Sequence, residues 1–277
     1  EMTIPATVPG DLLSDLHAAN AIGDPLYELN FKNSSIWHDN VWTYTTTFDT
    51  ATHDLQSGDE LLLVFDGIKM GANISLNGKK LGQAEDQFLR YSFPLVASNL
   101  LRTGNGVEEA ANTLEISFDS SACVDGRFMA CTGGWDWAPY TTTRAPDTGA
   151  NTFTKGIWKS VYLVKVSSAA ITHVVPQVKY DGAYPTARLV DGQHDDFTVG
   201  VKVFLESPHG TSGTVEVTGS WGSSDTTQVH LAAGSNTVTL ELNAKASDIR
   251  LWWPVGVGEQ PLYDVKASFT PSSKTIK

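Results

Sequence analysis

The segment FTVGVKVFL, residues 197–205, decides the fold of the second half of the chain. Its apolar side chains fall on every second residue, which is typical of a β-strand with one face buried and the other in solvent. Similar alternating segments come after it, separated by clusters of Gly, Ser, Asn and Asp. They lie at residues 215–217, 229–231, 238–242 and 263–269. The second half is therefore predicted to consist of β-strands.

The first half shows the same pattern after one short helix. The helix is predicted over residues 11–21, with Asp11 as its N-cap and Gly23 as its stop signal. Residues 41–48 alternate, residues 61–65 are continuously apolar as in a buried strand, and Asn77-Gly78 predicts a hairpin turn. Strands at this spacing predict an antiparallel sandwich that ends near Val166.

The chain is thus predicted to be all-β, with two domains at residues 1–167 and 168–277. The second has about 110 residues and roughly seven short strands, which is the size of an immunoglobulin-like sandwich. Neither half alternates strands with helices, so a (β/α)8 barrel is not expected within this chain.

Composition excludes several classes of function. The chain has 277 residues, 41% of them hydrophobic, and a formal net charge of −12. Nucleic-acid binding requires a basic surface, so no nucleic-acid partner is expected. No apolar run approaches the ~20 residues of a membrane-spanning helix, so no membrane partner is expected. The spacing of Cys and His predicts no metal, and the sequence predicts no cofactor. Asp195-Asp196 is interpreted as a solvated turn rather than a calcium site.

The segment Trp135-Asp136-Trp137, between Gly134 and Ala138-Pro139, is the strongest candidate for a binding site. Glycine and proline predict a shaped loop. Two indoles beside a carboxylate offer flat apolar faces and a hydrogen-bond acceptor, which suit a sugar ring. The alternative from the residues alone is that both Trp side chains belong to the core and Asp136 caps the turn.

Two further features concern processing and location. Cys123 and Cys131 precede the loop, and either a disulfide or two free thiols is compatible with their spacing. Asn33 and Asn73 each begin an N-glycosylation triplet, which matters if the chain passes through the secretory pathway. A lysosomal or extracellular location is the hypothesis, with a cytoplasmic one left open. No leader sequence is recognised at Glu1.

Several motifs in order resemble glycoside hydrolase family 2, and in particular its β-mannosidases. The early ones are Val8-Pro9-Gly10-Asp11, Asp24-Pro25-Leu26-Tyr27, Trp42-Thr43-Tyr44, Phe65-Asp66-Gly67, Leu76-Asn77-Gly78 and Arg90-Tyr91-Ser92-Phe93. The later ones are Gly134-Trp135-Asp136-Trp137, Gly156-Ile157-Trp158 and Arg250-Leu251-Trp252-Trp253-Pro254 with Gln260-Pro261-Leu262-Tyr263. They extend over most of the chain.

The resemblance implies a jelly-roll-like sugar-binding domain, then an immunoglobulin-like domain, then a catalytic barrel that this chain lacks. It implies an N-terminal fragment of a retaining exo-glycosidase that hydrolyses terminal β-linked sugars. Such enzymes use two carboxylates about 5–5.5 Å apart, and no residue of this chain is assigned either role. The fragment alone is expected to be inactive, and an exposed apolar face is expected where the barrel would dock.

The resemblance also assigns Trp135, Asp136 and Trp137 to substrate binding, with Asp136 accepting hydrogen bonds from the terminal sugar. Ala138 and the long stretch from Pro139 to Gly156 depart from the family pattern, so the sugar is left open. The alternatives are a related β-glucosaminidase or β-galactosidase, a free-standing carbohydrate-binding module, or a structural sandwich pair. Trp252 and Trp253 are expected on opposite faces, one in the core and one against the barrel.

Overall fold

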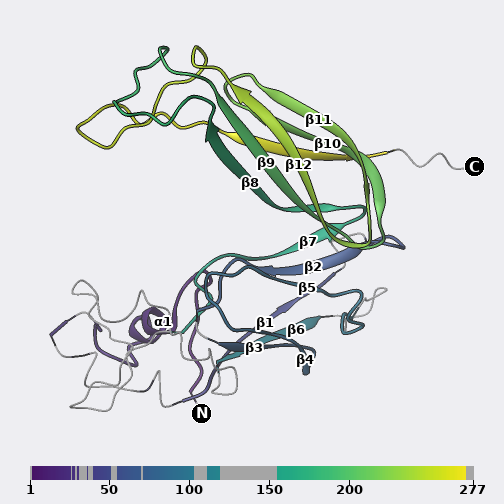
Figure 1. The fold of residues 1–277 in the computed structure, drawn as a ribbon. Helices are drawn as coiled ribbons and strands as arrows, with labels where there is room; N and C mark the ends of the chain where they lie inside the picture. The colour runs from purple at the N-terminus through teal and green to yellow at the C-terminus, as the bar shows by residue number, and fades with distance from the viewer. Residues whose placement is uncertain are drawn as a thin grey trace, which may run out of the picture. The chain divides into compact units, whose positions relative to one another are not determined.

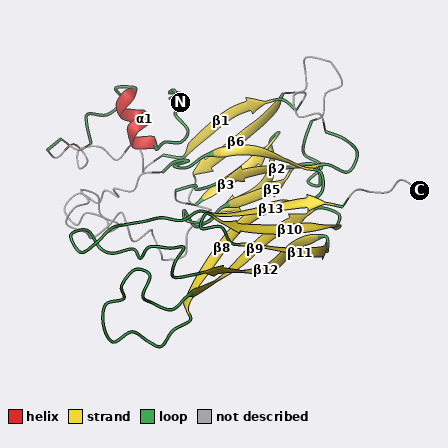
Figure 2. Cartoon of the chain, turned by 90° about the horizontal axis from the view of Figure 1, so that it is seen from above, coloured by secondary structure: helices red, strands yellow, loops and turns green. Residues whose placement is uncertain are grey.

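The computed structural model describes residues 2–25, 27–28, 30, 36, 40–50, 55–69, 71–102, 111–118 and 155–272. These residues contain one short helix and antiparallel strands, as predicted (Figures 1 and 2). The chain divides into two compact units, residues 1–165 and 166–277. The all-β fold class predicted from the alternating segments is confirmed.

The first unit is a sandwich of two sheets. One sheet has the strand order β1-β6-β3-β4 and the other has the order β5-β2-β7. The elements of this unit are α1 (Leu12–Ala18), β1 (Trp42–Phe48), β2 (Glu60–Phe65), β3 (Ala72–Leu76), β4 (Lys79–Ala84), β5 (Tyr91–Pro94), β6 (Asn112–Phe118) and β7 (Val161–Val166).

Inward-facing side chains of both sheets form the core of this unit. They include Tyr44 of β1, Phe65 of β2, Ile74 of β3 and Ile116 of β6. Every residue of β2 is buried, as its continuous apolar sequence predicted. The hairpin between β3 and β4 turns at Asn77 and Gly78, whose φ angles are 54° and 74°. Both angles are positive, as the Asn-Gly signal requires.

The helix α1 begins at its predicted cap but ends early. The Asp11 carboxylate accepts hydrogen bonds from the backbone N–H groups of Leu13 and Ser14, as an N-cap should. The helix ends at Ala18 instead of continuing to residue 21. Asn20 takes a left-handed conformation at φ 56°, and N–H groups of residues 20 and 21 bond back to the carbonyls of residues 17 and 16. This is a Schellman ending, with Asn in the place of the expected Gly.

The second unit is also a two-sheet sandwich. Its sheets have the orders β11-β10-β13 and β12-β9-β8. The elements are β8 (Ala170–Tyr180), β9 (Phe197–Ser207), β10 (Thr211–Gly219), β11 (Ser224–Leu231), β12 (Gly234–Ala244) and β13 (Val265–Pro271). The alternating residues of β9 point into the core as predicted, and Val201 and Val203 are fully buried. Strand β8 was not predicted.

Candidate functional site

The residues predicted to bind sugar lie outside the described part of the chain. Trp135, Asp136 and Trp137 belong to the segment 119–154, as do Cys123 and Cys131, and Asn33 is also outside the description. The structure describes what holds the two ends of this segment. Phe118 is the last described residue before it, and Lys155 is the first after it.

Both ends of the segment 119–154 are attached beside α1. Phe118 ends β6 and lies opposite Trp42 in the register of β1. Trp42 packs against the buried apolar cluster of α1, which contains Leu12 and Leu16. At the other end, the N–H of Leu12 donates to the carbonyl of Lys155 at 2.7 Å. The helix therefore links the start and the end of the segment that carries the predicted site.

Gly156 allows the close approach that makes this attachment. The N–H of Gly10 donates to the carbonyl of Ile157 at 2.9 Å, and the N–H of Lys69 donates to the carbonyl of Gly156 at 2.8 Å. A Cβ at Gly156 would lie 2.7 Å from the Cα of Asp11, and its φ is 156°. Any side chain there would collide with backbone, so the position requires glycine.

Trp158 connects the segments around Gly67 and Gln87 to residues 155–158. Its indole N–H donates to the carbonyl of Gln87 at 3.1 Å. A Cβ at Gly67 would lie 2.6 Å from the indole nitrogen, so the glycine makes room for the ring. The segments around Gly10, Gly67 and Gly156 are far apart in sequence, and the fold brings them together at residues 155–158.

An ion pair and a tyrosine lie next to Gly67. The Arg90 Nε donates to Asp66 Oδ1 at 2.7 Å, and the Tyr162 hydroxyl donates to the same oxygen at 3.2 Å. Burial raises the pKa of Tyr162, the Asp66 carboxylate adds to that effect, and the Arg90 charge opposes it. All three side chains are partly or largely exposed, so the ion pair contributes little stability. The hydrogen bond from Tyr162 of β7 to Asp66 connects the end of β2 to β7.

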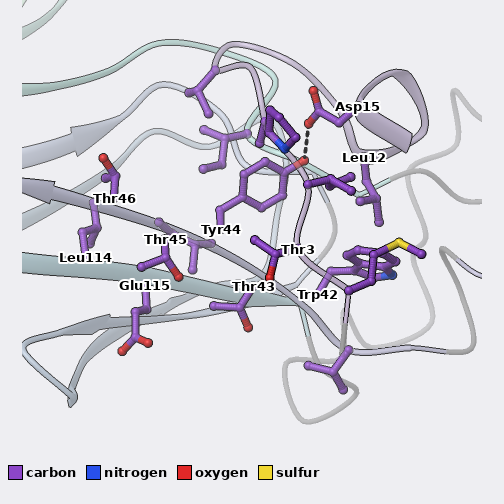
Figure 3. A pocket seen from close by; sticks show the side chains of 18 of the residues that line it. Thr3, Leu12, Asp15, Trp42, Thr43, Tyr44, Thr45, Thr46, Leu114 and Glu115 are labelled. Atoms are coloured by element: carbon purple, nitrogen blue, oxygen red, sulfur yellow. Dashed lines mark hydrogen bonds between the residues drawn. The ribbon is translucent and has the colours of Figure 1, made fainter. Parts of the chain in front are cut away.

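Asp15 and Tyr44 form a buried pair between α1 and β1 (Figure 3). The Tyr44 hydroxyl donates to Asp15 Oδ2 at 3.2 Å, and the N–H of Thr7 donates to Asp15 Oδ1 at 3.0 Å. Burial raises the pKa of Tyr44 well above its ordinary value, and the Asp15 carboxylate raises it further. The pair ties the N-terminal segment, the helix and the sheet together. Sequence reasoning missed it, because Asp15 reads as an ordinary residue in the first turn of a helix.

A cavity of about 1290 Å³ adjoins this pair within the first unit (Figure 3). One wall is the N-terminal segment at residues 2–6, and another is formed by Val41 and the first five residues of β1. Leu114, Glu115 and Ile116 of β6 border it as well. Its lining mixes hydroxyl, carboxylate and aliphatic groups.

In the second unit, the motif around Trp253 builds a shaped loop. The Arg188 guanidinium lies 4.3 Å from the centre of a Trp253 ring and donates to the carbonyl of Val257. The Gln260 amide donates to the carbonyls of Trp253 and Gly258. Trp253 is half-buried under Arg188 and does not belong to the core cluster, so the expectation that one of the two Trp side chains lies in the core is wrong. Arginine stacking replaces core burial here.

The same loops expose large apolar side chains. Trp252 is 55% exposed, and Tyr184, Val255 and Leu262 are 91%, 88% and 86% exposed. Contacts from Arg188 and from Asp191, which accepts the N–H of Leu251, connect the segment around residue 188 to the segment around residue 252. Several large apolar side chains exposed on connected loops are typical of a surface that another protein part covers.

The structure also describes Asn73 and the pair Asp195 and Asp196, which the sequence analysis considered. Asn73 is half-buried in the middle of β3, between β6 and β4. Asp195 and Asp196 are exposed and accept hydrogen bonds from the Tyr180 hydroxyl and the N–H of Ala246. Within the described ranges, no three His, Cys, Asp or Glu side chains form a group able to hold a metal ion. The described helix is too short to be a membrane span.

Comparison with family models decides the affiliation. Residues 1–159 match the model described as "Glycosyl hydrolase 2 galactose-binding domain-like". Residues 181–277 match the model "Glycosyl hydrolases family 2". The chain belongs to glycosyl hydrolase family 2. The resemblance found in the motifs is thereby confirmed, and the two units are the sugar-binding-like and immunoglobulin-like sandwiches of that family.

The relatives that the chain matches include β-mannosidases. The chain is 26% identical over 298 residues to β-mannosidase of Bos taurus, with 97% of this chain and 31% of the relative covered. It is 27% identical over 290 residues to β-mannosidase B of Emericella nidulans, with 95% and 30% covered. A solved β-D-mannosidase of Dictyoglomus thermophilum shares the fold at a TM-score of 0.67 and 22% identity, with 96% of this chain and 31% of that one covered. The chain thus spans about a third of these proteins.

Proposed function

We propose that this chain supplies the two N-terminal accessory domains of a retaining exo-glycosidase of the β-mannosidase type. The enzyme would remove terminal β-linked sugars, and both catalytic carboxylates would lie in polypeptide outside residues 1–277. Residues 1–167 would be the sugar-binding jelly-roll-like domain and residues 168–277 the immunoglobulin-like domain. One observation carries the proposal: β-mannosidases align with 95–97% of this chain but with only 30–31% of their own length.

The geometry of the first unit supports an accessory role. Two carboxylates of the first unit hold parts of the chain in place: Asp15 of α1 accepts hydrogen bonds from Thr7 and Tyr44, and Asp66, next to Gly67, accepts them from Arg90 and Tyr162. This arrangement suits a scaffold that presents the segment 119–154, and the chemistry would be done elsewhere. The exposed apolar loops of the second unit are the kind of surface on which the rest of such an enzyme would pack.

Hydrolysis by the whole protein tests the proposed activity. The full natural polypeptide would be assayed with the p-nitrophenyl β-glycosides of mannose, glucosamine and galactose. The proposal expects the highest kcat/KM with the mannoside. A preference for glucosaminide or galactoside would move the enzyme to one of the alternative specificities, and failure to hydrolyse any of the three would overturn the proposal.

The proposal assigns to Asp136 the role of accepting hydrogen bonds from hydroxyls of the terminal sugar, with Trp135 and Trp137 beside it. A hydrogen bond to a charged acceptor is worth about 1.5–3 kcal/mol. If this hydrogen bond stabilises the transition state, Asp136→Asn in the full polypeptide should lower kcat/KM roughly ten- to a hundredfold. Asp147→Asn, in the same segment, is the matched control and should leave kcat/KM unchanged. Equal effects of the two substitutions would remove Asp136 from the site.

A free-standing carbohydrate-binding module is the second candidate, because the same Trp-Asp-Trp segment would serve it. Calorimetric titration of mannose into the 277-residue chain separates the two. Saturable binding that is lost in Asp136→Ala would favour the module, and the absence of binding would favour the accessory role.

The proposal places the protein in the secretory pathway, in a lysosome or outside the cell. Asn33, Asn73 and the pair Cys123 and Cys131 support this placement. Intact mass of the protein purified from its natural source, before and after removal of N-glycans and reduction, provides the test. Unmodified Asn33 and Asn73 together with two free thiols would count against a secretory route.

A further inference from the structure

The turn between β3 and β4 carries an asparagine whose side chain is bonded to segments much later in the chain. The Asn77 Nδ2 group donates to the carbonyl of Leu100 at 2.7 Å and to Asn112 Oδ1 at 2.9 Å. Its Oδ1 accepts the N–H of Thr113 at 2.9 Å. A carbonyl can only accept and an N–H can only donate, so these partners fix which end of the amide is nitrogen. Both hydrogens of the Asn77 amide are therefore used.

Asn112 extends this network into the interior of the first unit. It is fully buried, and its side chain bonds twice to the backbone of Arg102. The Asn112 Oδ1 accepts the Arg102 N–H at 2.8 Å, and its Nδ2 donates to the Arg102 carbonyl at 3.0 Å. Asn112 Oδ1 thus accepts from two donors, the Arg102 N–H and the Asn77 amide. A buried polar network of this kind stabilises the fold only while its members keep their partners.

Asn77 is followed by Gly78, and an asparagine before glycine is chemically reactive. The backbone nitrogen of the glycine attacks the side-chain carbon Cγ and loses its proton, the amide nitrogen leaves as ammonia, and a succinimide ring forms. Water then opens the ring at one of its two carbonyl carbons and gives aspartate or isoaspartate. Glycine favours the first step because it has no Cβ and turns freely. The reaction needs no reagent other than water.

The folded turn blocks the first step of this reaction. The Asn77 Cγ can meet the Gly78 nitrogen only if the amide turns away from its three partners, which breaks three hydrogen bonds. The backbone is held as well, because the Asn77 N–H donates to the carbonyl of Thr113 at 2.8 Å. Asn77 and Gly78 both keep the positive φ of the turn. Unfolding of the first unit removes all of these restraints together.

We propose that Asn77 is a deamidation site that opens only when the first unit unfolds, and that its modification prevents the unit from refolding. An ionised aspartate has no side-chain N–H, so it would set a negative charge against two acceptors, the Leu100 carbonyl and Asn112 Oδ1. Isoaspartate adds a methylene group to the main chain inside a two-residue turn and so changes the geometry of the hairpin. Either product makes unfolding of the first unit irreversible.

Incubation in urea followed by refolding tests both parts of the proposal. The 277-residue chain is held in denaturing urea and, in parallel, in buffer at the same pH and temperature, and peptide mapping by mass spectrometry follows Asn77. Modified Asn77 should accumulate at least about tenfold faster in urea, because in buffer the site opens only by unfolding. Asn105-Gly106 has the same two residues and is mapped as a separate peptide. After dilution from urea, chromatography separates the folded chains, and these should contain only unmodified Asn77.

Three substitutions make the test specific. Gly78→Ala slows formation of the succinimide, and its Cβ would have no atom within 4 Å, so this variant should keep its refolded yield in urea while the wild type loses it. Asn77→Asp imitates one product and should unfold at a lower urea concentration than the wild type. Asn99→Asp is the matched control at an exposed residue of the same unit, also with positive φ, and should unfold like the wild type. Pulse proteolysis in increasing urea, followed on peptides of β6, reports on the first unit alone.

Each of three results would overturn the proposal. Modification of Asn77 at the same rate in buffer and in urea would show that the folded turn does not protect it. Modified chains that are as frequent among the refolded molecules as in the whole sample would show that the unit tolerates the product. Equal unfolding of Asn77→Asp and Asn99→Asp would lead to the same conclusion without any refolding step.

Discussion

At the residue scale, Tyr44 and Asp15 show how one buried pair joins three segments. Asp15 belongs to none of the recognised motifs, and the two residues are 29 positions apart. The alternation of residues 41–48 predicted a strand, and Tyr44 of that strand faces the core. The alternation could not predict that the hydroxyl would meet a carboxylate from a helix, because pairing between distant polar groups depends on how the elements pack.

The Tyr44 hydroxyl should make the stability of the first unit depend on pH, and Tyr44→Phe should remove that dependence. At pH 7, Tyr44→Phe should lose about 1–3 kcal/mol, because Asp15 keeps a buried oxygen without its donor. Above pH 10 an unfolded tyrosine loses its proton, whereas Tyr44 in the folded wild type keeps it, because burial and Asp15 raise its pKa. The wild type therefore loses stability as pH rises, by at most about 1.4 kcal/mol per pH unit.

The measurement is urea unfolding of both proteins between pH 7 and 11. The difference in unfolding free energy between wild type and Tyr44→Phe should be constant up to about pH 10 and narrow above it. A difference that stays constant to pH 11 would show that Tyr44 ionises normally in the folded protein.

Gly156 should be intolerant of any side chain. Its Cβ would meet the Cα of Asp11 at 2.7 Å, and neither backbone can move away without breaking the bond between Leu12 and Lys155. Gly156→Ala should therefore cost the first unit roughly 1–3 kcal/mol or more in chemical unfolding. Gly200→Ala is the control, since its Cβ would have only ordinary contact at 4.0 Å. Equal stability of the two variants would show that residues 155–157 are not held against α1.

At the scale of elements, a strand could be predicted from the sequence when its buried and exposed residues alternate without interruption. Strand β9 was predicted because its alternate residues are buried along the whole strand. Strand β8 was missed because its register shifts between Ile171 and His173, which changes the phase of its pattern, and because Pro176 and an exposed Val178 interrupt the rest of the strand. A bulge of this kind reverses which face later residues take.

The predicted end of α1 was wrong for a different reason. Gly is the usual residue that ends a helix in the left-handed conformation, and Gly23 was available. Asn20 can take that conformation too, and the buried cluster of Leu12, Leu13 and Leu16 is complete within two turns. Residues 19–23 then gain nothing from remaining helical.

The cap of α1 is a testable element on its own. Asp11→Ala removes the acceptor for the N–H groups of Leu13 and Ser14 and should destabilise the first unit by about 0.5–2 kcal/mol. Asp11→Asn keeps an acceptor oxygen and should retain most of the stability. Urea unfolding monitored by circular dichroism measures both. If the alanine variant is as stable as the asparagine variant, the helix is held by burial of its leucines alone.

At the scale of the whole molecule, the sequence predicted the two sandwiches and the family. The sequence did not predict that the segments around Gly10, Gly67 and Gly156 come together in the fold. Each motif gives information only about the residues next to it in the sequence. The loops around Trp252 expose large apolar side chains and are where we expect the apolar docking face, and their shape comes from Arg188 and Gln260. Such long-range polar contacts leave no periodic signal in the sequence.

The loops around Trp252 should become covered in the full polypeptide. Hydroxyl-radical footprinting of the 277-residue chain should label Trp252 readily, as it is 55% exposed. In the full polypeptide its labelling should fall several-fold, because a docked neighbour excludes the radical. His209, exposed in the turn between β9 and β10, is the reference and should label equally in both. Equal labelling of Trp252 would mean that this surface stays free.

The most direct test of the accessory role is the rate of p-nitrophenyl β-D-mannoside hydrolysis by the purified 277-residue chain and by the full polypeptide at equal molar concentration. The account predicts turnover by the full polypeptide and none above the buffer blank by the 277-residue chain, because the two carboxylates that a retaining glycosidase needs are placed outside these residues. Hydrolysis by the 277-residue chain that scales with its concentration would contradict it.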